Sequence, residues 1–248
     1  RVSRGSVEWM VEQSAGNALF LEELIRASAE GQMERQPDTV IAMLQARIGH
    51  LAPGSRRAVL AASVFGPVFW EAGVAEVLGL SAGTADLDSW MQEALATELI
   101  ELHRGSLLVH QKEYGFRHAL ARDAAYALLT EPDQQFGHQR AAEFLEKHAD
   151  EQLPSAVLAH HFKRAGPLEK ALRYYVRAGD RAAQMVVYSE AQQHYQSADE
   201  LLQLLPRTPE LRRAQADLIV KQAQCSYMAG GAARMLDRLA LAQGILSE

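Results

Sequence analysis

Histidine and cysteine are the side chains of this sequence best suited to nucleophilic, proton-transfer or metal-binding chemistry. The chain has a single cysteine, Cys225, and its histidines are His50, His103, His110, His118, His138, His148, His160, His161 and His194. The sequence contains no H-E-x-x-H motif and no cysteine pair with zinc-ligand spacing. His160 and His161 are adjacent and cannot share one helix face. We therefore predict no metal site, and no histidine is identified as a partner for Cys225 in a catalytic dyad.

Phosphate-binding loops are also missing from the sequence. Neither G-x4-G-K-[ST] nor G-x-G-x-x-G occurs in it. Without such a loop the chain cannot hold a transferred phosphate and its Mg²⁺. We expect no catalytic residues and no cofactor in this chain, so an independent enzyme is the least favoured class.

Length and composition are those of a globular protein with two or three modules. The 248 residues are 48% hydrophobic and 23% charged. No run approaches 18 consecutive apolar residues, so we expect no membrane span. A single cysteine agrees with a reducing, cytoplasmic setting. The sequence opens on Arg1 close to a predicted helix and stops just after another, so we expect a fragment of a larger protein.

Residues 1–50 are predicted to be helical, with a break at Gly16-Asn17. Asn17 is a good N-cap for a new helix running from Ala18, because its side-chain oxygen can accept from a free backbone N–H. The segment carries a net charge of −2. A second break at Pro53-Gly54 separates it from the next region.

Residues 51–135 combine short helices with a predicted β-hairpin. Two β-prone runs, 99–103 and 106–109, flank the turn dipeptide Arg104-Gly105, and 114–117 continues the pattern. This layout is typical of a winged helix, which leaves open a DNA-binding regulator as the alternative function. The region has 6 basic and 11 acidic side chains. Its candidate recognition helix, 118–129, carries only Arg122 as a basic residue, so we expect no nucleic-acid partner.

Residues 136–248 read as paired helices of similar length. We predict them at 136–149, 155–165, 168–186, 189–205 and 210–229. Within them, the spacing of small and aromatic residues matches a tetratricopeptide repeat. The small residues that would let two helices approach, and the larger ones that would fill the groove, are Tyr175, Gly179, Ala191, Tyr195 and Ala198. Any alanine-rich helical pair can produce some of these matches, which is the alternative interpretation.

Several segments, taken in order, resemble a known family. They are Gly16-Asn17-Ala18-Leu19-Phe20-Leu21-Glu22-Glu23-Leu24, Pro37-Asp38-Thr39-Val40, Ala46-Arg47-Ile48, Leu51-Ala52-Pro53, Phe116-Arg117-His118-Ala119-Leu120-Ala121-Arg122-Asp123-Ala124-Ala125-Tyr126 and Ala159-His160-His161-Phe162-x3-Gly166. Together they resemble the signal-transduction ATPases with numerous domains, the STAND class of regulatory P-loop ATPases. The similarity is to the bacterial branch attached to cyclases, kinases and transcription regulators, and it covers nearly the whole chain.

This resemblance implies a mainly all-α chain that begins after the ATPase core. Residues 1–50 would be a helical lid remnant, 51–135 a winged helix with a small β-hairpin, and 136–248 an α-solenoid of tetratricopeptide-like hairpins. The ATPase core would lie in cis and bind ATP or ADP with Mg²⁺ in the intact parent. The chain itself would be a non-catalytic regulatory or scaffold fragment that couples the nucleotide state to a protein or peptide partner of the repeats.

The resemblance also implies nucleotide contacts in the intact parent. In the family, a Gly-Asn-Pro-Leu segment of the lid touches the base, and the matching positions are Gly16, Asn17, Ala18 and Leu19, with Ala18 in place of the proline. A winged-helix histidine contacts the phosphates of ADP in the resting state, and the matching residue is His118. At the start of a helix, an imidazole and free backbone N–H groups both suit an anion. Local capping or packing by His118 is the alternative.

Overall fold

The computed structural model describes residues 4–14, 16–29, 39–148, 153–228, 239–240 and 242–244. These residues are mainly helical with one small three-stranded sheet, which confirms the predicted fold class at that level. The chain divides into two compact units, residues 1–134 and residues 135–248. The boundary predicted between residues 50 and 51 falls inside the first unit, so the lid and winged-helix assignments stay predictions. Among the described helices, none is long and apolar enough to cross a bilayer.

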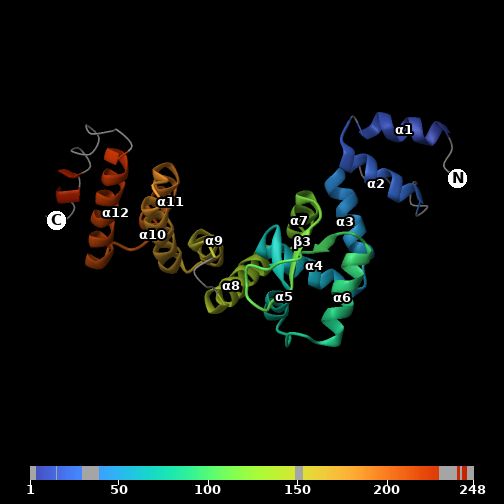
Figure 1. Ribbon diagram of the computed structural model, residues 1–248, viewed down its shortest axis with the longest axis horizontal. Helices are drawn as coiled ribbons and strands as arrows, with labels where there is room; N and C mark the ends of the chain where they lie inside the picture. Colours follow the sequence, from blue (N-terminus) through green and yellow to red (C-terminus); the bar gives the residue numbers. More distant parts are fainter. Residues whose placement is uncertain are drawn as a thin grey trace. The chain divides into compact units, whose positions relative to one another are not determined.

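The first unit contains a small sheet and helices of 8 to 13 residues (Figure 1). They are α1 (Arg4–Ser14), α2 (Ala18–Ala29), α3 (Val40–His50), α4 (Pro53–Phe65), α5 (Glu71–Leu78), α6 (Ala85–Ala96) and α7 (Ala119–Tyr126). Helix α3 packs on α7, and α4 packs on α5, α6 and α7. Helices α1, α2 and α3 meet around a small apolar cluster of Met10, Leu24 and Met43.

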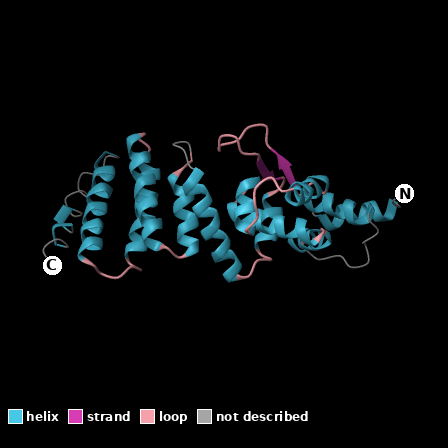
Figure 2. Ribbon diagram, turned by 90° about the horizontal axis from the view of Figure 1, so that it is seen from below, coloured by secondary structure: helices cyan, strands magenta, loops and turns pink. Residues whose placement is uncertain are grey.

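The sheet is antiparallel and has the order β1-β3-β2, with strands β1 (Val68–Trp70), β2 (Ile100–Leu102) and β3 (Glu113–Phe116). Figure 2 shows these short strands in magenta among the helices. Phe69 of β1 is fully buried and stacks on Tyr114 of β3, with ring centroids 5.8 Å apart. These aromatic contacts join the sheet to the core of the unit.

The predicted hairpin forms with a different return strand. Strand β2 pairs with β3, whereas the run 106–109 is not a strand. Instead, Ser106 accepts a hydrogen bond from the indole of Trp70 (3.1 Å), and the Glu113 carboxylate accepts one from the N–H of Leu107 (2.8 Å). These contacts fold 106–109 into a loop with Leu108 buried, so the prediction for this run was wrong.

Helix starts follow local capping chemistry. The Asn17 side chain accepts a hydrogen bond from the N–H of Phe20 (3.1 Å), which confirms it as the cap of α2. Thr39 caps α3 in the same way. Helix α8 begins at Glu131, five residues before its predicted start, because Pro132 is tolerated in the first turn, where no intrahelical N–H bond is lost.

In the second unit, the described residues form helices and the turns that connect them. Apart from α8 (Glu131–His148), whose first turn belongs to the first unit, they are α9 (Ser155–Ala165), α10 (Leu168–Gln184), α11 (Tyr188–Leu202) and α12 (Pro209–Met228). Helix α10 packs on α9 and α11, and α11 packs on α12. Figure 1 shows α10 and α11 side by side. Breaks at Gly166, where φ is +110°, and at Pro206 separate consecutive helices.

Candidate functional site

His118 lies in the short connection between β3 and α7. It is the N-cap residue of α7, but its side chain makes no capping hydrogen bond. Its ring is one-third exposed, and Nε2 lies 3.7 Å from Oε2 of Glu22 in α2. Nε2 is itself buried and has no hydrogen-bond partner among the described residues. The imidazole is therefore oriented toward α2 without being saturated by hydrogen bonds.

The other predicted nucleotide-contact residues lie at the N-terminus of α2. Gly16 has φ of +82°, Asn17 caps the helix, and both are exposed together with Ala18. Glu22 follows Ala18 by four residues and so lies one turn further along the same face. The structure thus brings His118 to α2, but the contact is made at Glu22 rather than at residues 16–18.

A group of ion pairs surrounds this corner. Arg26 of α2 contacts Glu98, which follows α6, at 2.6 Å, and Glu98 also contacts Arg117 at 3.0 Å. The hydrogen bonds from Arg26 and then from Arg117 lower the pKa of the Glu98 carboxyl. Glu98 raises the pKa of Arg26 in return. One carboxylate therefore links α2 to the residue that precedes His118.

Glu98 occupies a backbone conformation that normally favours glycine. Its φ is +54°, and the N–H groups of Glu98 and Leu99 bond to the carbonyls of Leu95 and Ala94. This is the Schellman pattern that ends a helix. The same pattern ends α5, where the left-handed residue is Gly79, with φ of +68°. Non-glycine residues are disfavoured there, and from this position the Glu98 side chain holds two cations.

A more buried pair anchors α2 to α3. Arg47 of α3 lies 2.6 Å from the carboxylate of Glu23, which is only 4% exposed. Around His118 the charged contacts are half-exposed, whereas this one is shielded from solvent. Salt will weaken the exposed pairs more than the Arg47–Glu23 pair.

Helix α7 is poorly suited to bind the phosphate backbone of DNA. Arg122 donates from Nε to the carbonyl of Ser63 (2.9 Å), contacts Asp123 at 3.0 Å and stacks over the ring of Tyr126. The single cation of this helix is therefore engaged within the molecule. Recognition of DNA by α7 would require several free cations.

In the second unit, Gly179 of α10 is pressed against Tyr195 of α11. A Cβ atom at Gly179 would lie 2.3 Å from a carbon of the Tyr195 ring. Ala191 and Ala198 of α11 are fully buried, while Tyr175 is half-buried and lies near His194, with ring centroids 6.5 Å apart. These are the residues that the repeat spacing singled out, although Tyr175 packs less completely than Tyr195.

Asp180 joins three helices in a way that sequence reasoning missed. Its carboxylate accepts a hydrogen bond from the hydroxyl of Tyr195 (2.8 Å) and lies 2.6 Å from Nζ of Lys221 in α12. Burial, and then the bond to Asp180, raise the pKa of the Tyr195 hydroxyl. Asp180 thus ties α10 to α11 and to α12 through side chains.

Another missed contact lies between α8 and α9. His138 and His161 are both buried, and their Nδ1 atoms are 2.9 Å apart. An Nδ1–Nδ1 hydrogen bond needs one donor and one acceptor, so one of these two nitrogens carries a proton and the other does not. The ring of His160 lies 5.7 Å from that of His138, centroid to centroid. Within the described ranges, no group of three potential ligands could hold a metal ion.

Comparisons with protein-family models, with curated proteins and with solved structures found no match.

Proposed function

We propose that this chain is a regulatory and scaffold segment of a STAND-like ATPase. In this proposal the first unit responds to nucleotide bound by an ATPase core in cis, and the second unit binds a protein or peptide. The observation that carries it is the placement of His118, whose unsaturated imidazole faces α2 next to the Arg26–Glu98–Arg117 bridge.

The architecture supports this interpretation of the first unit. The α1–α3 cluster is the candidate lid. Helices α4–α7 with the β1-β3-β2 sheet, and the loop between β2 and β3 as a wing, make the candidate winged helix. Lid and winged helix are joined at the His118 corner by half-exposed charged contacts, which a bound phosphate can rearrange at modest cost.

The second unit supports the interaction half of the proposal. Each of α9–α12 packs mainly on its neighbours along the chain, as in an α-solenoid. The close approach of Gly179 to Tyr195 is the packing that a tetratricopeptide hairpin requires. An array of this kind presents extended surfaces that suit protein partners rather than chemistry.

In the intact parent, His118 would donate a hydrogen bond to a phosphate of ADP and so stabilise the closed, inactive arrangement. The core would supply Mg²⁺ and most nucleotide contacts, with further contacts from Gly16, Asn17 and Ala18. The chain by itself is expected to hydrolyse no ATP. Sustained phosphate release by the purified chain, at a rate unaffected by further purification, would contradict this.

The test is ADP affinity of the complete gene product with and without His118→Ala. A charge-assisted hydrogen bond is worth roughly 1.5–3 kcal/mol, so its loss should weaken ADP binding by about tenfold to a hundredfold. His50→Ala, at an exposed position in α3, is the matched control and should leave affinity unchanged. Equal affinities for wild type and His118→Ala, with the same circular dichroism spectrum, would leave His118 as a packing residue. Absence of a P-loop upstream of Arg1 in the gene would overturn the proposal as a whole.

A further inference from the structure

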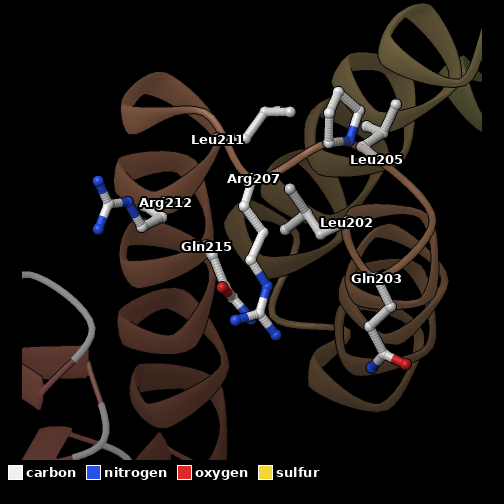
Figure 3. Close-up of a pocket in the computed structure, with 8 residues that line it drawn as sticks. Leu202, Gln203, Leu205, Arg207, Leu211, Arg212 and Gln215 are labelled. Atoms are coloured by element: carbon white, nitrogen blue, oxygen red, sulfur yellow. The ribbon is translucent and has the colours of Figure 1, made fainter. Parts of the chain in front are cut away.

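The connection between α11 and α12 forms a groove with a mixed lining. It encloses about 410 Å³, within the lower range of ligand pockets. Its walls include the half-buried side chains of Leu202, Leu205 and Leu211. In the view of Figure 3, the side chain of Arg207 extends from the connection between α11 and α12 in the direction of Gln215, which also lines the groove. Leucine side chains and polar groups therefore line the same groove, which exposes more polar than apolar surface.

Arg207 has no ion pair within the described part of the chain. The nearest acid in sequence, Glu210, forms no ion pair with Arg207; hydrogen bonds from its own N–H and from Thr208 lower the pKa of the Glu210 carboxyl. Residues 207–213 hold three arginines and one glutamate, so the connection has a local excess of positive charge. The guanidinium of Arg212 points away from Arg207 in Figure 3. A carboxylate entering the groove would therefore meet Arg207 and Gln215.

We propose that this groove binds a peptide segment in which an Asp or Glu stands next to a leucine-like side chain. The guanidinium fork of Arg207 takes the carboxylate in a two-point contact, with the Gln215 amide as a further donor. The leucine-like side chain occupies the space lined by Leu202, Leu205 and Leu211. A bare anion would leave these leucines in water. Of the described lining residues, only Arg207 and Arg212 are cations and none is aromatic, whereas nucleic-acid sites use several cations and aromatic platforms.

This inference rests on the proposed protein-binding function of the second unit and names the chemistry of its partner. The test begins with selection of random dodecapeptides displayed on phage against the purified 248-residue chain. Selected peptides are then synthesised with a fluorophore, and their affinities are measured by anisotropy at low and high salt. We expect the selected sequences to pair Asp or Glu with Leu, Ile, Met or Phe, and binding to weaken as salt rises.

Arg207→Gln should weaken the affinity for the selected peptides about tenfold or more. Arg207→Lys should recover only part of the loss, because lysine keeps the charge but not the fork. Arg213→Gln is the matched control: this exposed neighbour is not among the lining residues, and it should change affinity by less than about twofold. Both arginines are exposed, so neither substitution removes core packing.

Each contrary outcome has a separate meaning. Peptides that bind equally well to Arg207→Gln would overturn the groove assignment and leave the protein-binding function standing. An equal loss with Arg213→Gln would reduce the effect to general charge and overturn it too. If C-terminal amidation of the peptides abolished their binding, Arg207 would contact a terminal carboxylate and the assignment to an Asp or Glu side chain would be refuted. Tighter, Arg207-dependent binding of a single-stranded oligonucleotide would also refute that assignment. If no peptide is enriched, this inference and the proposed protein-binding function fail together.

Discussion

The contact between Gly179 and Tyr195 makes a sharp prediction about the second unit. In an exposed helix interior, Gly→Ala is stabilising by up to about 1 kcal/mol because alanine is the better helix former. At Gly179 the added Cβ would lie 2.3 Å and 2.5 Å from two carbons of the Tyr195 ring. Ordinary carbon–carbon contacts are about 3.5–4.0 Å, so the ring must move by more than about 1 Å.

Tyr195 is poorly able to make that movement. Its side chain is 2% exposed, and its hydroxyl is held by Asp180, which is itself paired with Lys221. Overpacking of this kind costs about 1–3 kcal/mol. After the gain in helix propensity of about 1 kcal/mol is subtracted, Gly179→Ala should lower the free energy of unfolding by up to about 2 kcal/mol.

The assay is urea unfolding followed by two probes. The three tryptophans, Trp9, Trp70 and Trp90, all belong to the first unit, so their fluorescence reports on that unit, whereas far-UV circular dichroism reports on both. We expect Gly179→Ala to lower the dichroism midpoint by up to about 1 M urea and to leave the fluorescence midpoint unchanged. Gly49→Ala, where an added Cβ meets no atom within 4 Å, is the control of opposite sign.

A double-mutant cycle isolates the contact. In a Tyr195→Leu background the ring is gone, so adding Gly179→Ala should cost nothing further. If Gly179→Ala stabilises the protein as Gly49→Ala does, the close approach of α10 and α11 does not constrain residue 179 and the packing argument is refuted.

Three other predictions concern helix ends and charge. Val186 follows α10 with φ of +65° in the same Schellman pattern and is 66% exposed. Replacing it by glycine relieves backbone strain, so Val186→Gly should raise the free energy of unfolding by about 0.5–1 kcal/mol and the melting temperature by about 2–5 °C. An unchanged or lower melting temperature would show that Val186 is not strained. A hydrogen bond from the hydroxyl of Ser55 lowers the pKa of the Glu93 carboxyl from its ordinary value of 4.5. The resulting stabilisation is present above pH 4.5 and is lost as pH falls through the lower pKa of the folded state. The free energy of unfolding of wild type should therefore exceed that of Glu93→Gln by less in acid, and a constant difference between the two from pH 6 to about pH 3 would exclude the linkage. Glu98→Gln should speed amide hydrogen exchange in α2 because both exposed bridges are lost, whereas Asp86→Asn in α6 should not; equal exchange rates in α2 would show that the bridges do not hold it.

Local chemistry allowed much of the helical layout to be predicted from the sequence. Asn17 is recognisable as a cap because its side chain bonds to an N–H three residues away, and Gly166-Pro167 marks a helix end by backbone conformation alone. The Gly179, Tyr195 and Ala198 spacing was visible because a helix repeats every 3.6 residues, so one face can be read directly. Such signals depend on neighbours within a few residues, and they identified the mainly helical fold.

The tertiary structure decided which distant residues meet. Both 106–109 and 113–116 could have paired with β2; the Glu113 carboxylate and the Trp70 indole, which bind the backbone and side chain of the intervening loop, selected the second. Arg26–Glu98 and Asp180–Lys221 join residues 72 and 41 positions apart, and no periodicity links such positions. A charged residue on a helix surface looks the same in sequence whether it faces solvent or another helix. The bridge beside His118 and the open guanidinium of Arg207 are therefore properties of the packed chain.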